Sequence, residues 1–133
     1  MKISASVKNS FNNHVVAVDT NGNSQALSIA SKSSGYGSSV NGGELLLLAL
    51  ATCFCNDIYR EATRRNILVT GVDVEVTGEF GGEGEPGTNF QYKTRVTSDA
   101  PAEVIQDLIS YTDRIAEINN TLRKGLAIKL INS

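Results

Sequence analysis

The stretch GGELLLLALATCFCNDIYREATRR, from Gly42 to Arg65, holds an almost unbroken apolar run and predicts a long central helix. Asn41 before it is a preferred N-cap residue, and Glu44 three positions later completes the pattern of a capping box. The first half is apolar all round, which predicts burial on every side, whereas the second half is amphipathic. Two cysteines, Cys53 and Cys55, lie where the two halves meet, so the helix either buries two inert thiols or presents one in a pocket.

The segments before this helix predict an antiparallel meander. Apolar residues alternate with polar ones at 2–7, 14–19 and 26–30, as half-buried strands require, and Asn-rich turns separate these segments. The polar stretch 31–43 then leads into the helix, as a lid or only as a connector.

The chain after the central helix predicts two strands, two helices and a closing strand. Asp99 is expected to cap the first of these helices, with Pro101 in its first turn. The expected elements are strands at 68–80 and 89–98, a helix opening with DAPAEVIQDLISY, a short helix near 119–124 that ends at Gly125, and a strand at 126–132. The full order is strand, strand, strand, helix, strand, strand, helix, helix, strand, which predicts an α+β fold in a single domain, 1–133.

Length and charge restrict the classes of function. The chain has 133 residues, 12 basic against 14 acidic side chains, a net charge of −2 and a pI near 5.3. This balance lacks the basic patch of a nucleic-acid-binding domain, so nucleic acid is not an expected partner. The N-terminus lacks the apolar segment of a secretory signal, and the apolar run 45–55 is shorter than the ~20 residues that cross a bilayer. We therefore expect a soluble, cytoplasmic protein without a membrane partner, with its thiols in a reducing compartment.

The residues around the cysteines offer few obvious activating groups. Cys53 and Cys55 point roughly 200° apart around a helix, so a disulfide between them would need local unwinding. Arg60 lies about two turns beyond Cys53, roughly 10 Å along the axis, which is too far to bond a thiolate directly. A metal site made of both thiols, Asp57 and His14 fails because the thiols diverge. We expect neither a metal nor a cofactor.

Four segments of the sequence resemble the OsmC/Ohr family, the osmotically inducible and organic hydroperoxide resistance proteins. They read ELLLLALATCFCND, VDVEVTGEF, APAEVIQ and AEINNTLRKGLAIKL. The resemblance implies an OsmC-like fold with antiparallel sheets packed around a long central helix, in an intertwined homodimer of bacterial oxidative-stress defence. It also implies a thiolate that attacks a hydroperoxide, a second Cys that resolves the sulfenic acid, and an Arg and a Glu that activate the thiolate.

Carried over residue by residue, the resemblance keeps part of this machinery. Cys53 lies at the position of the family's peroxide-reactive Cys, and the family's Glu falls at Glu44 or, in the other register, at Gly43. Ala116 stands where the second Cys would be, and the first Arg in the sequence is Arg60, well after the N-terminal strands that carry the family's Arg. The resemblance therefore implies catalytic residues Cys53 and Glu44 in a chain that departs from the family pattern at two positions.

Two functions follow as hypotheses. The first is a thiol-dependent hydroperoxide reductase, a peroxidase in which Cys53 reduces organic hydroperoxides at a pocket walled by Leu46, Leu50 and Phe54 and is recycled by an external dithiol. The alternative is a catalytically degenerate dimer that binds a small hydrophobic ligand. The sequence leaves open whether Cys55, or an Arg of the partner chain such as Arg60 or Arg95, replaces the missing family residues.

Overall fold

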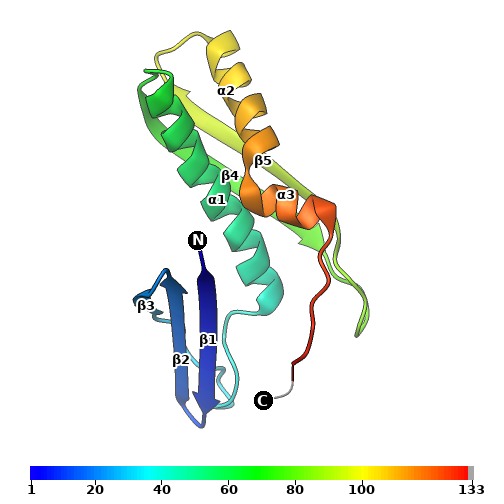
Figure 1. Ribbon diagram of the computed structural model, residues 1–133. Helices are drawn as coiled ribbons and strands as arrows, with labels where there is room; N and C mark the ends of the chain where they lie inside the picture. Colours follow the sequence, from blue (N-terminus) through cyan, green and yellow to red (C-terminus); the bar gives the residue numbers. More distant parts are fainter. Residues whose placement is uncertain (132–133) are drawn as a thin grey trace. The chain divides into compact units, whose positions relative to one another are not determined.

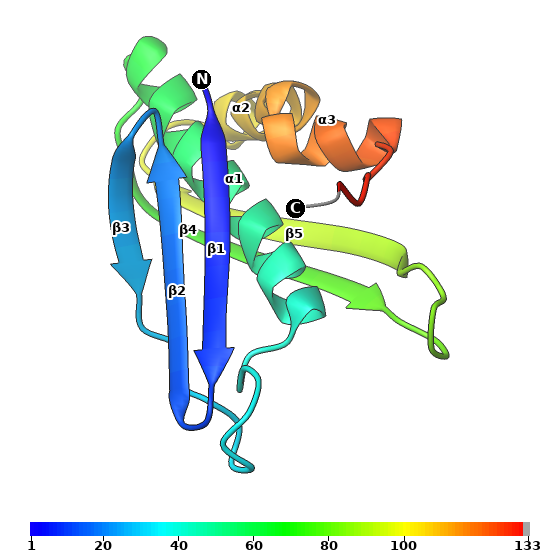
Figure 2. The same cartoon turned by 60° about the horizontal axis from the view of Figure 1, so that its bottom comes forward.

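The computed structural model describes residues 1–131, and within them the chain forms two compact units, Met1–Leu45 and the part from Leu46 onward (Figures 1 and 2). The strands are β1 (Ile3–Ser10), β2 (Asn13–Thr20), β3 (Asn23–Leu27), β4 (Val69–Glu79) and β5 (Thr88–Ser98), and the helices are α1 (Gly42–Arg64), α2 (Ala102–Ile115) and α3 (Glu117–Lys124). This is the predicted α+β order up to the closing strand. That the two units act as one domain stays a prediction.

The first unit is the predicted antiparallel meander, with strand order β1-β2-β3. Asn12 and Asn21 adopt left-handed backbone conformations in the two turns, which Asn tolerates better than most residues. Ile3 pairs with Thr20 in one hairpin, and Thr20 pairs with Asn23 in the other. The third strand lies earlier than predicted and ends at Leu27.

Both ends of α1 follow from local sequence. The backbone N–H of Glu44 donates to Asn41 Oδ1 (2.7 Å), and Glu44 Oε1 accepts from the N–H of Asn41 (3.0 Å), which confirms the predicted capping box. At the other end Asn66 is left-handed, with φ of 56°, and the N–H of Ile67 donates to the carbonyl of Ala62 (2.9 Å). This is a Schellman ending, in which Asn takes the place that Gly usually fills.

In the second unit, the helices cover one face of the β4-β5 hairpin. Its core is formed by fully or nearly fully buried residues of α1, α2 and the α2-α3 junction, namely Phe54, Ile58, Ala62, Leu108 and Ala116. Alternating residues of the hairpin pack against them, among them Val72, Val74, Tyr92 and Val96. Figures 1 and 2 show α1 and α2 lying over this hairpin, with α3 beside them. The core therefore places the second half of α1 against α3.

The prediction that the first half of α1 is buried on every side is wrong within the described chain. Leu48 is 58% exposed and Leu45 is also exposed, whereas Phe54, Ile58 and Ala62 in the second half form the core. The reason is that one two-stranded hairpin covers only a few turns of a 23-residue helix. By length and mean hydropathy α1 is a candidate membrane span, yet its second half is the core helix of this unit.

Two further predictions about the elements are wrong. Helix α2 begins after Pro101, which is its N-cap residue, so Asp99 does not cap it. A residue that precedes proline is held out of the helical region, and Ala100 therefore separates Asp99 from the helix. The closing strand is absent from 126–131, and Asn132 lies outside the described residues. Ile128 and Leu130 are each 97% exposed, because no sheet edge within residues 1–131 pairs with this segment.

Candidate functional site

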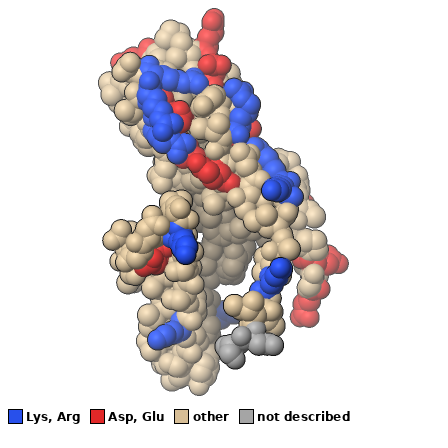
Figure 3. All heavy atoms as spheres, in the orientation of Figure 1, with Lys and Arg blue, Asp and Glu red and all other residues tan. Residues whose placement is uncertain are grey.

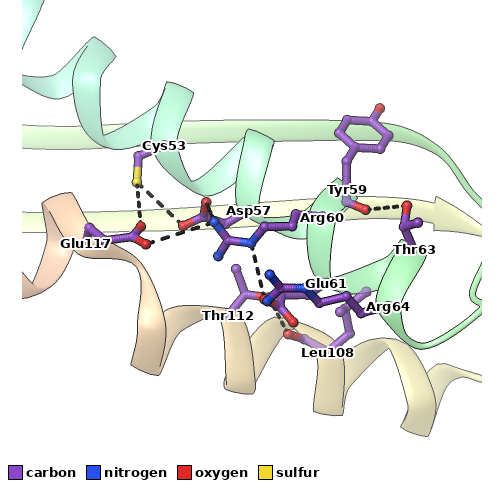
Figure 4. Close-up of polar contacts among 10 residues, drawn as sticks. All are labelled: Cys53, Asp57, Tyr59, Arg60, Glu61, Thr63, Arg64, Leu108, Thr112 and Glu117. Atoms are coloured by element: carbon purple, nitrogen blue, oxygen red, sulfur yellow. Dashed lines mark hydrogen bonds and ion pairs between the residues drawn. The ribbon is translucent and has the colours of Figure 1, made fainter. Parts of the chain in front are cut away.

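The thiol of Cys53 meets two carboxylates in the second unit. Its S–H donates to Asp57 Oδ2 at 3.6 Å, one turn further along α1, and Glu117 Oε2 of α3 lies 3.9 Å from the same sulfur (Figure 4). Asp57 is buried and Glu117 is exposed. The spacing of four residues between Cys53 and Asp57 puts them on one helix face, whereas Glu117 reaches the site only through the tertiary fold.

Arg60 approaches the same two carboxylates from the side away from the sulfur. Its Nη1 lies 3.0 Å from Asp57 Oδ1 and 3.9 Å from Glu117 Oε1, so each carboxylate turns one oxygen to the thiol and the other to the guanidinium (Figure 4). Arg60 Nε also contacts Glu61 at 3.3 Å, and this buried carboxylate pairs with Arg64 at 2.9 Å. Arg60 therefore forms ion pairs with the carboxylates and forms no bond with the sulfur.

The N-terminus of α3 gives Cys53 a backbone neighbour. Ala116, fully buried, is the N-cap residue of α3, and the backbone of Ile118 in the first turn of α3 lowers the pKa of the Cys53 thiol. The first turn of a helix carries partial positive charge from its free N–H groups. The chain thus supplies one group that stabilises a thiolate at the place where the family resemblance put a missing second Cys.

The balance of these groups holds the proton on the sulfur. Burial raises the pKa of the Cys53 thiol above its ordinary value, the backbone of Ile118 lowers this pKa by less, and the carboxylates of Asp57 and Glu117 raise it further. Burial and the charge of Glu117 also raise the pKa of Asp57 above 3.8, although Arg60 works in the opposite direction. The thiol of Cys53 therefore keeps its proton more readily than a free thiol does, and it lies beside carboxylate oxygens that can accept this proton.

The raised pKa predicts that the alkylation rate of Cys53 reaches its maximum only at high pH. In a Cys55→Ser background, the rate of reaction with iodoacetamide is expected to rise tenfold per pH unit through neutrality, because only the thiolate reacts, and to reach half its maximum at a higher pH than the rate of an unburied cysteine thiol does. The iodide that leaves iodoacetamide needs no proton, so Asp57 affects this reaction only through its charge, which opposes the thiolate. Asp57→Asn removes that charge, so the midpoint should fall and the rate at pH 7.5 should rise. A wild-type midpoint below pH 8, measured by mass spectrometry of quenched samples, would contradict this assignment.

The donor atoms of Cys53, Asp57 and Glu117 lie within 4.8 Å of one another, a spacing that a metal ion could use. Arg60 already supplies the positive charge between the two carboxylates. We therefore treat the three residues as a thiol with its carboxylate partners. The metal site considered from sequence combined Cys53, Cys55, Asp57 and His14. Of these residues, Cys53 and Asp57 lie together in the structure. His14 lies in the first unit, where its Nδ1 is 2.9 Å from Nδ2 of Asn9.

The other residues considered for catalysis, Cys55, Glu44 and Arg95, form no hydrogen bond or ion pair with the Cys53 thiol within residues 1–131. Cys55 is a free, half-buried thiol, as is Cys53. Glu44 is engaged in the capping box nine positions before Cys53, a rise of roughly 13 Å along α1, so its catalytic role stays a prediction. Arg95 pairs with Asp73 across the β4-β5 hairpin at 2.8 Å.

The predicted pocket wall of Leu46, Leu50 and Phe54 is only partly realised. Phe54 is sealed in the core, with its ring centroid 4.8 Å from that of Tyr92. Leu50 lines a cavity of about 110 Å³ together with Phe90 and Asn119.

The fold and the site together define an α+β protein with a carboxylate-flanked free thiol on its central helix. The family model described as OsmC-like protein matches residues 35–131, so the chain belongs to the OsmC-like family. No curated protein matches the sequence.

Three solved structures share this fold at low sequence identity. An OsmC-like protein from Mycoplasma pneumoniae has a TM-score of 0.62 and 18% identity, over 92% of this chain and 86% of that one. An OsmC-like hydroperoxide resistance protein from Jannaschia sp. CCS1 has a TM-score of 0.57 and 20% identity, over 95% and 89%. A putative organic hydroperoxide resistance protein from Vibrio cholerae, with captopril bound in one of the active sites, has a TM-score of 0.59 and 20% identity, over 92% and 85%. At these identities the three structures show a likeness of fold, and the names of two of them describe hydroperoxide resistance proteins.

Proposed function

We propose that this protein reduces organic hydroperoxides through the thiol of Cys53. The observation that supports this best is the contact of Cys53 Sγ with Asp57 Oδ2 at 3.6 Å, beside the N-terminus of α3. A nucleophilic thiol needs a nearby base or another way to lower its pKa, and Asp57 offers the base. The name of the Jannaschia relative, a hydroperoxide resistance protein, agrees with this reaction class.

In the proposed step Asp57 accepts the proton of the Cys53 thiol while the sulfur attacks the distal oxygen of the hydroperoxide. The S–O bond forms as the O–O bond breaks, and the leaving alkoxide takes the proton from Asp57. The products are the sulfenic acid of Cys53 and an alcohol, so the sulfur is oxidised by two electrons and the peroxide is reduced by two. General acid–base help of this kind contributes about 10²- to 10⁴-fold.

Turnover then depends on an external dithiol. Ala116 stands where the family resemblance places a resolving Cys, and Cys55 points away from Cys53 on the same helix. One thiol of the reductant condenses with the sulfenic acid and releases water, and its second thiol displaces the Cys53 thiolate as the reductant closes its own disulfide. Such recycling suits the cytoplasm, where dithiols stay reduced.

The proposed active form is a homodimer. Leu48 on α1 and the segment that contains Ile128 and Leu130 expose apolar side chains that a monomer leaves in water. An alternating apolar segment without a sheet edge of its own is suited to pair with the sheet of a second copy. The intertwined dimer implied by the family resemblance would cover these residues and complete the pocket at Cys53.

The direct test is the consumption of cumene hydroperoxide by purified wild-type protein in the presence of dithiothreitol. The proposal expects catalytic consumption, with many peroxide molecules reduced per chain, and the same rate from Cys55→Ser within about twofold. Consumption that stops after one equivalent would contradict recycling by a dithiol. The absence of any consumption above the background would contradict the reaction itself.

A second candidate is a dimer that binds a small hydrophobic ligand, and the raised pKa of Cys53, caused first by burial, favours it. The first unit offers an apolar pocket of about 530 Å³ between its sheet and the chain that leads to α1, lined by residues such as Val7, Val16, Leu27 and Leu45. Binding of an apolar fluorescent probe that Val16→Glu abolishes, without peroxide turnover in either protein, would favour this function over the first.

A further inference from the structure

Within residues 1–131, the two carboxylates at Cys53 pair with a single cation, Arg60, and contact the sulfur through their other oxygens. Asp57 and Glu117 turn Oδ2 and Oε2 to the sulfur, at 3.6 and 3.9 Å, and turn Oδ1 and Oε1 to Arg60, at 3.0 and 3.9 Å. The nearest charges to the thiol are therefore both negative. In Figure 4 the guanidinium of Arg60 lies beyond the carboxylates as seen from the sulfur.

The two carboxylates differ in their access to solvent. The side chain of Asp57 is 7% exposed, whereas that of Glu117 is 67% exposed. Glu117 therefore presents its charge to molecules in solution that approach the sulfur. Figure 3 shows acidic side chains between basic ones on the face over α1, α2 and α3, so this surface carries local charges of both signs.

We propose that the charge of Glu117, together with that of Asp57, makes Cys53 react more slowly with reagents that carry a carboxylate than with uncharged reagents. Where it concerns turnover, this inference rests on the proposed function. The favoured oxidants are alkyl and aryl hydroperoxides without an ionised group, and hydroperoxides that carry a carboxylate close to the peroxide group are disfavoured. The favoured reductants are neutral or cationic dithiols, and anionic thiols such as glutathione are disfavoured.

The expected size of the effect follows from the distances. At about 4 Å in water one unit charge changes the local concentration of another by about fivefold, and by more where solvent is excluded. Because Glu117 is exposed, salt will screen its part of the effect. We therefore expect a discrimination of about three- to tenfold at low ionic strength that shrinks at 0.5 M salt.

The first arm of the test uses alkylation, which needs no peroxidase activity. In a Cys55→Ser background, the ratio of the rate with iodoacetate to the rate with iodoacetamide is measured for Cys53 and for 2-mercaptoethanol. The ratio for Cys53 is expected to be three- to tenfold lower, and Glu117→Gln should recover part of the difference, because Asp57 keeps its charge. Glu103→Gln, an exposed change in the first turn of α2, is the matched control and should leave the ratio unchanged.

Two results of this arm would overturn the inference. One is a ratio equal to that of 2-mercaptoethanol, which would mean that the carboxylates exert no field on the approaching reagent. The other is a lowered ratio that stays equally low in Glu117→Gln and in the control Glu103→Gln. This result would show that Glu117 does not cause the discrimination. Glu117 is exposed, so its variant is expected to fold, and circular dichroism checks this.

The second arm compares cumene hydroperoxide with its para-carboxylate analogue, a pair matched in shape. Faster consumption of the neutral compound, with a preference that Glu117→Gln reduces, supports the inference. Equal rates on the two compounds would overturn the selectivity while the proposed function stands. No consumption of either compound would overturn the proposed function, and the alkylation ratio would still decide the role of Glu117.

Discussion

A Cys53→Ser variant is expected to lose dithiol-dependent consumption of cumene hydroperoxide, to below about one hundredth of the wild-type rate. The reason is chemical, because a serine hydroxyl beside Asp57 keeps its proton at neutral pH and cannot form the sulfenic acid on which turnover depends. The substitution replaces one small, half-buried side chain by another of similar shape, so the fold should survive. Peroxide consumption is followed colorimetrically at pH 7.5 with dithiothreitol in excess.

Cys55→Ser is the matched control for this loss, since it changes the same chemical group two positions along the same helix. It should keep at least about half of the wild-type rate, because the Cys55 side chain points to another side of α1. If both variants lost activity equally, the two thiols would act together and the one-cysteine mechanism would be wrong. If Cys53→Ser kept its activity, the reaction would lie elsewhere in the protein.

Phe54→Ala is expected to cost about 3–5 kcal/mol of the free energy of unfolding, which is a large part of the total for a domain of this size. Phe54 is fully buried beside Ile58 and Leu108, and its ring packs against Tyr92 with centroids 4.8 Å apart. The truncation leaves a cavity that these neighbours fill only in part. Urea unfolding followed by circular dichroism measures the difference.

Phe80→Ala is the comparison for this stability loss. Phe80 follows β4, its side chain is half exposed, and its ring contacts that of Phe90 with centroids 5.9 Å apart. We expect a cost below about 1.5 kcal/mol, because much of the ring already lies in water. Equal losses from the two variants would contradict the assignment of the core to the face of α1 that carries Phe54.

Local sequence patterns predicted most of the elements. The capping pair Asn41 and Glu44 located the start of α1 exactly where the hydrogen bonds are found, and Gly125 marked the end of α3. Both signals act within a few residues, so they can be read without knowledge of the tertiary fold. The same holds for the antiparallel hairpins, whose turns carry Asn residues with left-handed backbones.

The errors lie where a segment needs partners that local sequence does not specify. The apolar pattern at 126–131 has the alternation of a strand, but pairing within the described chain is absent. The first half of α1 is apolar, yet Leu48 is exposed. In both cases apolar side chains that would be expected in a core are exposed in the described chain. A second copy of the chain is our proposal for the missing cover.

The catalytic roles of Cys53 and Glu44 stay predictions, and the structure adds the neighbours of Cys53. Cys53 was identified from the family resemblance, and Asp57 was weighed only as a metal ligand, although its spacing of four residues already placed it beside the thiol. Glu117 and the backbone of Ile118 were missed, because α3 reaches Cys53 only through the packing of the second unit. The activating and charged groups here come from residues to which the resemblance assigned no role.

The most direct test of the central claim is to trap the sulfenic acid of Cys53. Wild-type protein is treated with one equivalent of cumene hydroperoxide in the presence of dimedone, and fragment ions distinguish Cys53 from Cys55. The account predicts a dimedone adduct on Cys53 in most chains and little on Cys55. Recovery of Cys53 as an unmodified thiol, after excess hydroperoxide and hours of incubation, would contradict it.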